Sequence, residues 1–212
     1  RSRVGAEIGV VYLRSGETKR AEASFSQVLS DQTDDTAMLT AARQLAVMHT
    51  AAGDNKALVG ALEIVVRLEP DADARHNAAR RLARMCETDV EDPARAISAW
   101  RALVESPWAD EALRRLGVLY EQAGDEDGQI DVIERRSRRI RDPIEARELA
   151  LKAAELRTSR GRDRGAALDS WRAFVAQYGP TRDAHAPMIP LLEQEKQWKE
   201  LAWVLERCGR GC

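Results

Sequence analysis

The sequence is poor in cysteine, in aromatic residues and in net charge. Its 212 residues include three cysteines, Cys86, Cys208 and Cys212, and only 5% are aromatic. An odd number of cysteines with no C-x-x-C pair excludes a disulfide framework. We expect Cys86 to be a small buried residue. Cys208 and Cys212 receive no assigned role. The formal net charge of −2 gives no overall attraction to nucleic acid or to an anionic membrane.

Long apolar runs and secretion signals are also missing. No stretch approaches the roughly 18 apolar residues of a membrane span, and no signal-peptide pattern is visible. We therefore expect no membrane insertion and favour a cytoplasmic location. A periplasmic location stays open, because the chain begins with Arg1 rather than Met and its N-terminus can be truncated.

The motifs of common catalytic sites are absent as well. The sequence contains no P-loop, no G-x-G-x-x-G, no H-E-x-x-H and no G-x-S-x-G. Its three histidines, His49, His76 and His185, lie far apart in the chain, and no metal-ligand spacing connects them. We predict that the chain is not an enzyme and binds neither a metal nor a cofactor.

The sequence does contain an internal repeat. The segment "IGVVYLRSGET", which begins at Ile8, returns as "LGVLYEQAGDE", which begins at Leu116. The offset, 116 − 8 = 108, is three times 36, and a period in this range is typical of stacked helical repeats. Ala, Leu, Arg and Glu, which favour helices, dominate the composition, and we expect no strand.

The first copy has the spacing L-G-x2-Y…G…A-x3-F, carried by Ile8, Gly9, Tyr12, Gly16, Ala21 and Phe25. This pattern resembles the tetratricopeptide repeat (TPR), a helix–turn–helix unit of about 34 residues. Gly9 would let two helices approach closely, and Gly16 would end the first helix in a left-handed conformation. Phe25 would fill the core of the hairpin.

The resemblance extends along nearly the whole chain in degenerate copies. We expect an all-α array of antiparallel helical hairpins, forming one continuous right-handed superhelix, with a mixed array of irregular hairpins as the nearest alternative. The six hairpins would span approximately residues 4–34, 35–70, 71–107, 108–142, 143–180 and 181–212. A second, longer period, 163 − 92 = 71, relates "DPARAISAWRALV", from Asp92, to "DRGAALDSWRAFV", from Asp163. The chain also resembles the long, Arg- and Ala-rich repeat proteins that bacteria use as scaffolds.

In TPR proteins the first helices of the hairpins line a concave groove that binds extended peptides. When the repeats are aligned with one another, the resemblance places Arg43, Arg80 and Arg114 at equivalent positions (repeat slots) in that groove. Their predicted neighbours are Asn77, Arg84, Glu111, Val47, Val118 and Glu121. Three aligned guanidiniums would suit an acidic peptide or a terminal carboxylate. The alternative is that the arginines are solvated or paired with nearby glutamates.

The last hairpin provides a second candidate surface. The segment "QWKELAWVLER" predicts a helix with Trp198, Ala202 and Leu205 facing inward. Trp203 would occupy the slot that packs on a following hairpin, which this chain lacks. A longer protein, a partner or a second copy of the chain could cover Trp203, so a homo-oligomer through the C-terminal hairpin is one hypothesis.

The favoured function is therefore a non-catalytic scaffold or adaptor that binds a peptide or helix of another protein. The main alternative is a regulatory or sensor segment of a larger protein whose catalytic domain lies outside this chain. A nucleic-acid-binding repeat is a minor alternative, supported only by the basic segments "ERRSRRIR", residues 134–141, and "RTSRGRDR", residues 157–164. No aromatic residues interrupt these segments, which argues against binding to single strands.

Overall fold

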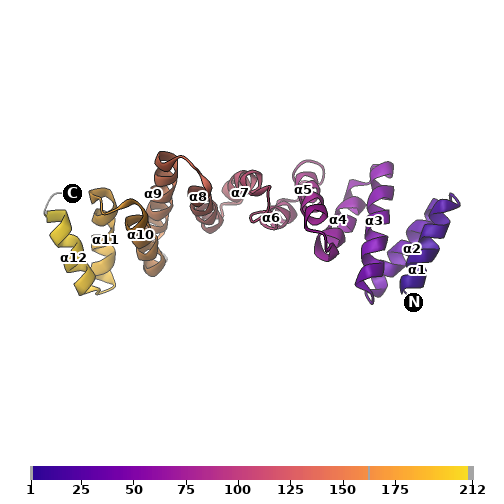
Figure 1. Ribbon diagram of the computed structural model, residues 1–212, viewed down its shortest axis with the longest axis horizontal. Coiled ribbons are helices and arrows are strands. Elements are labelled where there is room, and N and C mark those ends of the chain that lie inside the picture. Colours follow the sequence, from indigo (N-terminus) through magenta and orange to yellow (C-terminus); the bar gives the residue numbers. More distant parts are fainter. Residues whose placement is uncertain (1, 162, 210–212) are drawn as a thin grey trace. The chain divides into compact units, whose positions relative to one another are not determined.

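The structure is a computed structural model that describes residues 2–161 and 163–209, and every regular element in these ranges is an α-helix (Figure 1). The all-α prediction is confirmed. The helices are α1 (Ser2–Arg14), α2 (Thr18–Asp31), α3 (Asp35–Ala52), α4 (Asn55–Leu68), α5 (Ala72–Thr88), α6 (Pro93–Arg101), α7 (Ala109–Ala123), α8 (Glu126–Arg139), α9 (Pro143–Arg160), α10 (Arg164–Tyr178), α11 (Arg182–Gln194) and α12 (Trp198–Gly209). The helices follow one another in the order of the predicted hairpins, although α1 begins at Ser2, two residues before the first predicted range.

Aspartates begin most of the helices. A side-chain oxygen of each capping aspartate accepts a hydrogen bond from a backbone N–H in the first turn, which satisfies a donor that the helix itself cannot pair. The capping residues are Asp34, Asp54, Asp71, Asp92, Asp125, Asp142 and Asp163. The Asp-Pro pairs that begin α6 and α9 also place proline at the first helical position, where its missing N–H costs nothing.

Gly9 determines how closely the first hairpin packs. A Cβ atom at this position would lie 2.5 Å from Cε1 of Phe25, whose ring is fully buried between α1 and α2. Gly16 ends this first helix with φ +81°, a left-handed conformation that glycine adopts without steric cost. Both roles expected from the sequence are confirmed.

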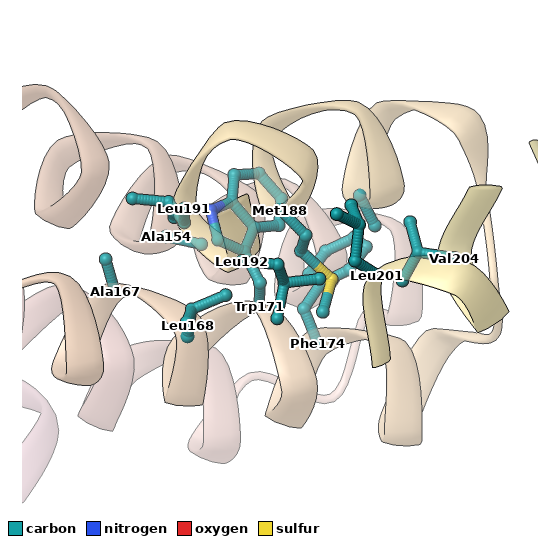
Figure 2. Close-up of a cluster of buried hydrophobic side chains, with 11 residues drawn as sticks. Ala154, Ala167, Leu168, Trp171, Phe174, Met188, Leu191, Leu192, Leu201 and Val204 are labelled. Carbon is teal, nitrogen blue, oxygen red and sulfur yellow. The ribbon is translucent and has the colours of Figure 1, made fainter. Parts of the chain in front are cut away.

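The longer of the two sequence periods is visible in the packing of two tryptophans. Trp100 on α6 and Trp171 on α10 are both fully buried. The indole N–H of Trp171 donates to Thr158 Oγ1 at 2.8 Å, and that of Trp100 donates to Glu87, the residue that matches Thr158 in this period. Each tryptophan therefore fills the core of its hairpin and hydrogen-bonds the first helix of the same hairpin. Figure 2 shows the core around Trp171.

The prediction for α12 was wrong by one residue. Trp198 and Leu205 are 60% and 46% exposed, and Ala202 is exposed too, whereas Leu201 and Val204 are buried. The turn before α12 has Lys196, not glycine, in the left-handed conformation (φ 55°), so the sequence carries no glycine to fix the register. The first backbone hydrogen bond of α12 runs from Leu201 N–H to Gln197 O. Leu201 therefore takes the inward-facing repeat position that the sequence predicted for Ala202.

The chain forms two compact units, one ending at Arg115 and the other beginning at Leu116, within α7. The first unit contains the hairpins α1–α2, α3–α4 and α5–α6 and the start of α7. The second contains the rest of α7 and the helices α8 to α12. One continuous superhelix through all six hairpins stays a prediction. Within the described ranges, no helix is both long enough and apolar enough to cross a bilayer.

Candidate functional site

The arginines predicted to line a groove are held by glutamates of the same chain. Arg43, on α3, donates through Nε to Glu69 Oε2 at 3.0 Å and through a second nitrogen to the same oxygen. The Glu69 side chain is only 2% exposed, while that of Arg43 is 53% exposed. Glu69 follows α4 directly and also accepts from the backbone N–H of Asp71 at 3.3 Å. The carboxylate thus fixes the guanidinium while leaving one side of it open to solvent.

A second glutamate holds two arginines on α5. Glu111, in the first turn of α7, accepts from Arg80 Nε at 2.7 Å through Oε2 and from Arg84 Nη2 at 2.6 Å through Oε1. The Arg80 guanidinium also stacks over the Trp108 ring, with Cζ 4.0 Å from the ring centroid. Arg80, Arg84 and Glu111 were predicted neighbours, and pairing with glutamate was the alternative left open. Trp108 was not predicted.

The electrostatics of Glu111 follow from this geometry. Burial alone would raise the pKa of the Glu111 carboxyl, but hydrogen bonds from Arg84 and Arg80 lower it below its ordinary value. The carboxylate therefore remains ionised at neutral pH. It offsets one of the two arginine charges and holds both guanidiniums in fixed positions.

The other predicted groove residues lie on the surface. Asn77 and Arg114 are exposed, and Val47 on α3 is 66% exposed. Among the described residues, Arg114 has no carboxylate within ion-pair distance. Arg43 and Arg114 each lie ten positions before a left-handed glycine, Gly53 and Gly124, which supports their assignment to one repeat slot.

Two of the predicted groove residues belong to the second unit. Val118 is 46% exposed, and Glu121 is exposed as well. Their membership in a common groove with the residues of the first unit stays a prediction. We define the first-helix face as the surface formed by Arg43, Val47, Asn77, Arg80, Arg84 and Arg114, all in the first unit.

Two of the clefts in the first unit are lined mostly by residues of its first helices. One, of about 250 Å³, lies on α5 and is lined by Asn77, Arg80, Arg81, Arg84, Met85, Thr88 and Asp89. The other, of about 410 Å³, lies between α1 and α3 and is lined mainly by small and apolar side chains, among them Ala6, Val10, Val11 and Ala37. The first helices of this unit thus border both a polar and an apolar depression.

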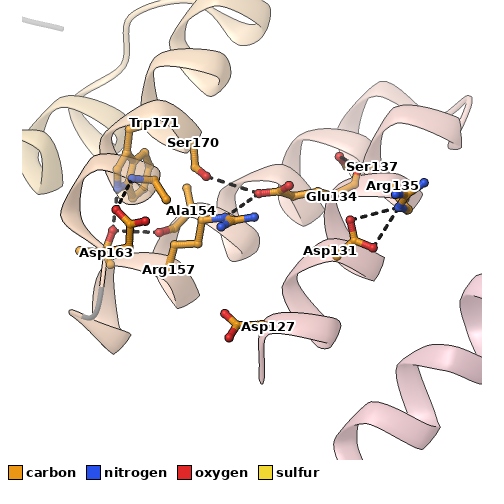
Figure 3. A network of polar contacts seen from close by, with 12 residues as sticks. Asp127, Asp131, Glu134, Arg135, Ser137, Ala154, Arg157, Asp163, Ser170 and Trp171 are labelled. Atoms are coloured by element: carbon orange, nitrogen blue, oxygen red, sulfur yellow. Dashed lines mark hydrogen bonds and ion pairs between the residues drawn. The ribbon is translucent and has the colours of Figure 1, made fainter. Parts of the chain in front are cut away.

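Several arginines of the basic segments in the second unit pair with acids, and Figure 3 shows the pairs of Arg135 and Arg157. Arg157 donates to Glu134 at 2.8 Å and Arg135 to Asp131 at 2.9 Å, and Arg160 pairs with Glu126 at 2.7 Å and with Asp127. These ion pairs offset part of the positive charge that binding to a phosphate backbone would use.

Trp203 occupies a different slot from the predicted one, because of the one-residue correction in α12. Its ring packs edge-on against His185 of α11, with centroids 5.7 Å apart, and Arg207 lies over it at 4.3 Å. It is 42% exposed. His185 is completely buried, and in the described part of the chain neither of its ring nitrogens has a hydrogen-bond partner. A role for Trp203 as a contact surface stays a prediction.

Potential metal ligands do not gather in the described ranges, where no three His, Cys, Asp or Glu side chains are close enough to hold an ion. Cys86 is buried, as predicted. Burial, followed by the charges of Asp92 and Glu63, raises the pKa of its thiol to about 11. Cys212 lies outside the described residues, and the side chain of Cys208 is not described.

No protein-family model matches the chain, and no curated protein sequence matches it. Solved structures that align with it include Naa15/Naa10 bound to HypK-THB, at 15% identity and a TM-score of 0.49 over 100% of this chain. The chain spans only 32% of the length of the chain it matches there. Identities and TM-scores this low do not identify a partner or an activity.

Two bacterial structures align with comparable identity. One is a tetratricopeptide repeat protein from Parabacteroides merdae, with 15% identity and a TM-score of 0.37 over 99% of this chain and 78% of that one. The other is PilF of Pseudomonas aeruginosa, with 16% identity and a TM-score of 0.34 over 100% of this chain and 93% of that one. The chain is TPR-like in its own right, because its helices pair in hairpins with the predicted glycine and aromatic contacts.

Proposed function

We propose that the chain is a non-catalytic protein-interaction scaffold and that its first-helix face binds an acidic peptide or helix of a partner protein. The observation that carries this proposal is the arrangement of arginines around Glu69 and Glu111. Because these glutamates already hold the guanidiniums in place, a partner would lose less conformational entropy in binding them than in binding mobile side chains.

The arginines keep donors for a partner. Arg43 and Arg84 each use Nε and one terminal nitrogen for their glutamate, and a guanidinium has five N–H donors. Their side chains are 53% and 55% exposed. A carboxylate of a partner can therefore approach the outer edge of each guanidinium without displacing the glutamate.

The charge of the face also favours an acidic partner. Arg80, Arg84 and Arg114 carry three positive charges, and Glu111 supplies one negative charge among them. Arg43 and Glu69 balance each other. The excess is modest, so we expect electrostatics to affect the rate of association and its salt dependence more than the final affinity.

Selection from a random peptide library tests this proposal. Peptides enriched on the native chain should be acidic, and their affinity should fall as salt increases. The test variant carries Arg80→Gln, Arg84→Gln and Arg114→Gln. The matched control carries Lys19→Gln, Arg67→Gln and Arg101→Gln, which removes the same charge from exposed positions on the second helices α2, α4 and α6.

We expect the test variant to lose at least about tenfold in affinity, since hydrogen bonds to charged groups contribute about 1.5–3 kcal/mol each. The control should lose about twofold or less through its change in net charge. Equal losses in both variants, or enrichment of peptides without acidic residues, would contradict the proposal. A regulatory segment of a larger protein could bind its partner through the same first-helix face. This test therefore locates the binding surface and does not distinguish a separate scaffold from such a segment.

A further inference from the structure

Arg80 is held in two ways by residues at the start of α7. Glu111 accepts a hydrogen bond from Arg80 Nε at 2.7 Å. Trp108, three residues earlier in the chain, covers a face of the same guanidinium, with Arg80 Cζ 4.0 Å from the ring centroid. The hydrogen bond and the stacking contact together restrict where the guanidinium lies and how it can turn.

The segment that joins α6 to α7 fixes Trp108 through its backbone. Ser106, which is only 6% exposed, donates from Oγ to Leu103 O at 2.7 Å and accepts from the backbone N–H of Trp108 at 3.0 Å. The carbonyl of Trp108 accepts from the backbone N–H of Ala112 at 2.9 Å. Because both backbone groups of Trp108 are bonded, its ring meets Arg80 from a fixed point of the chain.

Trp108 differs from the tryptophans that fill the hairpin cores. Trp100 and Trp171 are fully buried, and each donates its indole N–H to a side chain of the same hairpin. Trp108 is only partly buried, and its indole N–H neither is buried nor has a partner within the described ranges. Filling a core therefore does not account for Trp108.

The terminal nitrogens of Arg80 remain open to a ligand. Among the described residues, neither Nη1 nor Nη2 has a hydrogen-bond partner, and neither nitrogen is buried. The Arg80 side chain is 27% exposed. These two nitrogens form the end of the guanidinium, which can bind a carboxylate through two parallel N–H···O bonds.

Arg80 also lines the cleft of about 250 Å³ on α5, which we call the α5 cleft. The charged residues of its lining are Arg80, Arg81, Arg84 and Asp89. Three formal positive charges thus stand against one negative charge, and Glu111 offsets one more. The remaining single positive charge matches one carboxylate. The α5 cleft is smaller than the clefts of about 300–1,000 Å³ that hold drug-sized ligands, which suits a single side chain.

We propose that Trp108 is a positioning residue for partner binding. It holds Arg80 so that the end of the guanidinium binds a side-chain carboxylate of the partner, seated in the α5 cleft. This inference rests on the proposed function and names the arginine that contacts the acid and the residue that orients it. An arginine that is already oriented loses less conformational freedom when the partner binds.

Affinity for one acidic peptide, selected on the native chain, tests this role. The peptide is amidated at its C-terminus, so only its side chains supply carboxylates. Trp108→Leu removes the aromatic face and should weaken binding about three- to tenfold, because the guanidinium regains its freedom. Trp108→Phe keeps an aromatic face and should bind within about twofold of the native chain. The matched control, Trp203→Leu, removes the contact between Trp203 and Arg207 in the second unit and should bind like the native chain.

A double-mutant cycle separates positioning from a purely structural role. In the background of Arg80→Lys, Trp108→Leu should change the affinity by less than about twofold, because an ammonium has no planar end to orient. Replacing the acidic residues of the peptide one at a time by the matching amide should reveal one residue whose effect shrinks in Trp108→Leu. Urea unfolding of every variant verifies that each one is folded.

The role of Trp108 is overturned if Trp108→Leu binds within about twofold of the native chain. It is also overturned if the loss persists unchanged in the Arg80→Lys background, or if Trp108→Phe loses as much affinity as Trp108→Leu. Failure of the proposed function gives a different result. Selected peptides without acidic residues, or an affinity that survives the triple change of Arg80, Arg84 and Arg114 to Gln, would overturn both proposals.

Discussion

Replacing Gly9 by alanine tests whether the first hairpin depends on a close approach of α1 and α2. The new methyl group would lie 2.5, 2.7 and 2.9 Å from three atoms of the Phe25 ring, whereas ordinary contacts are about 3.5–4.0 Å. The ring is fully buried, so it has little room to move. Overpacking of a core typically costs about 1–3 kcal/mol.

A gain in helix propensity opposes this cost. Alanine is more favourable than glycine within a helix by about 1 kcal/mol, so the net change should lie between about zero and a loss of 2 kcal/mol. Gly60 in α4 provides the matched control, because a Cβ atom there meets nothing within 4 Å and its φ is not positive. Gly60→Ala should therefore stabilise the chain by about 0.5–1 kcal/mol.

Urea unfolding followed by circular dichroism measures both variants, and hydrogen exchange of α1 and α2 localises the effect. Local measurement matters because repeat hairpins unfold partly independently. The double variant Gly9→Ala with Phe25→Leu should lose less than the sum of the single changes, by about 1 kcal/mol. If Gly9→Ala behaves like Gly60→Ala, or if the two changes are simply additive, the close contact does not limit the packing.

Three further predictions concern buried ionisable groups. Glu69→Gln should destabilise the chain by about 1–3 kcal/mol in urea unfolding, while Glu63→Gln, at a half-exposed pair, should cost about 1 kcal/mol or less; equal costs would contradict the role of Glu69. Burial and then the charge of Arg207 lower the pKa of His185, so the unfolded chain binds the proton more readily. The free energy of unfolding should fall as the pH drops below about 6.5. His185→Leu should remove the contribution of His185 to this fall between about pH 7.5 and 5.5. A pH dependence that is the same in the variant and the native chain would refute this role of His185. With Cys208 and Cys212 replaced by serine, the thiol of Cys86, whose pKa is about 11, should react with iodoacetamide at about pH 8 only after unfolding; rapid reaction of the folded chain would show that it is accessible.

The hairpins were predictable because their signals are local. Gly9 and Gly16 act through neighbouring backbone geometry, and the structure confirms both roles. The Asp-Pro pairs act in the same local way at the starts of α6 and α9. The register of α12 was not predictable from the same signals, since Lys196 adopts the left-handed conformation usually reserved for glycine. The aspartate caps give no help there either, because Gln197 precedes the helix.

The candidate site was predictable only in part. The repeat slots brought Arg80, Arg84 and Glu111 together correctly. The stacking of Arg80 on Trp108 depends on the irregular segment that joins α6 to α7, for which the repeat pattern has no slot. The burial of Glu69 was missed because a glutamate beside Pro70 resembles an ordinary exposed turn residue; its environment arises from the approach of Arg43.

Site-specific photo-crosslinking tests the central claim most directly. A photoreactive residue replaces either Val47, on the first-helix face, or Arg101, at an exposed position on α6, and each chain is irradiated with an acidic peptide selected on the native chain. Our account predicts that the peptide crosslinks from the position of Val47 and that an excess of unlabelled peptide abolishes the product. Crosslinking from the position of Arg101 and not from that of Val47 would contradict binding at the first-helix face.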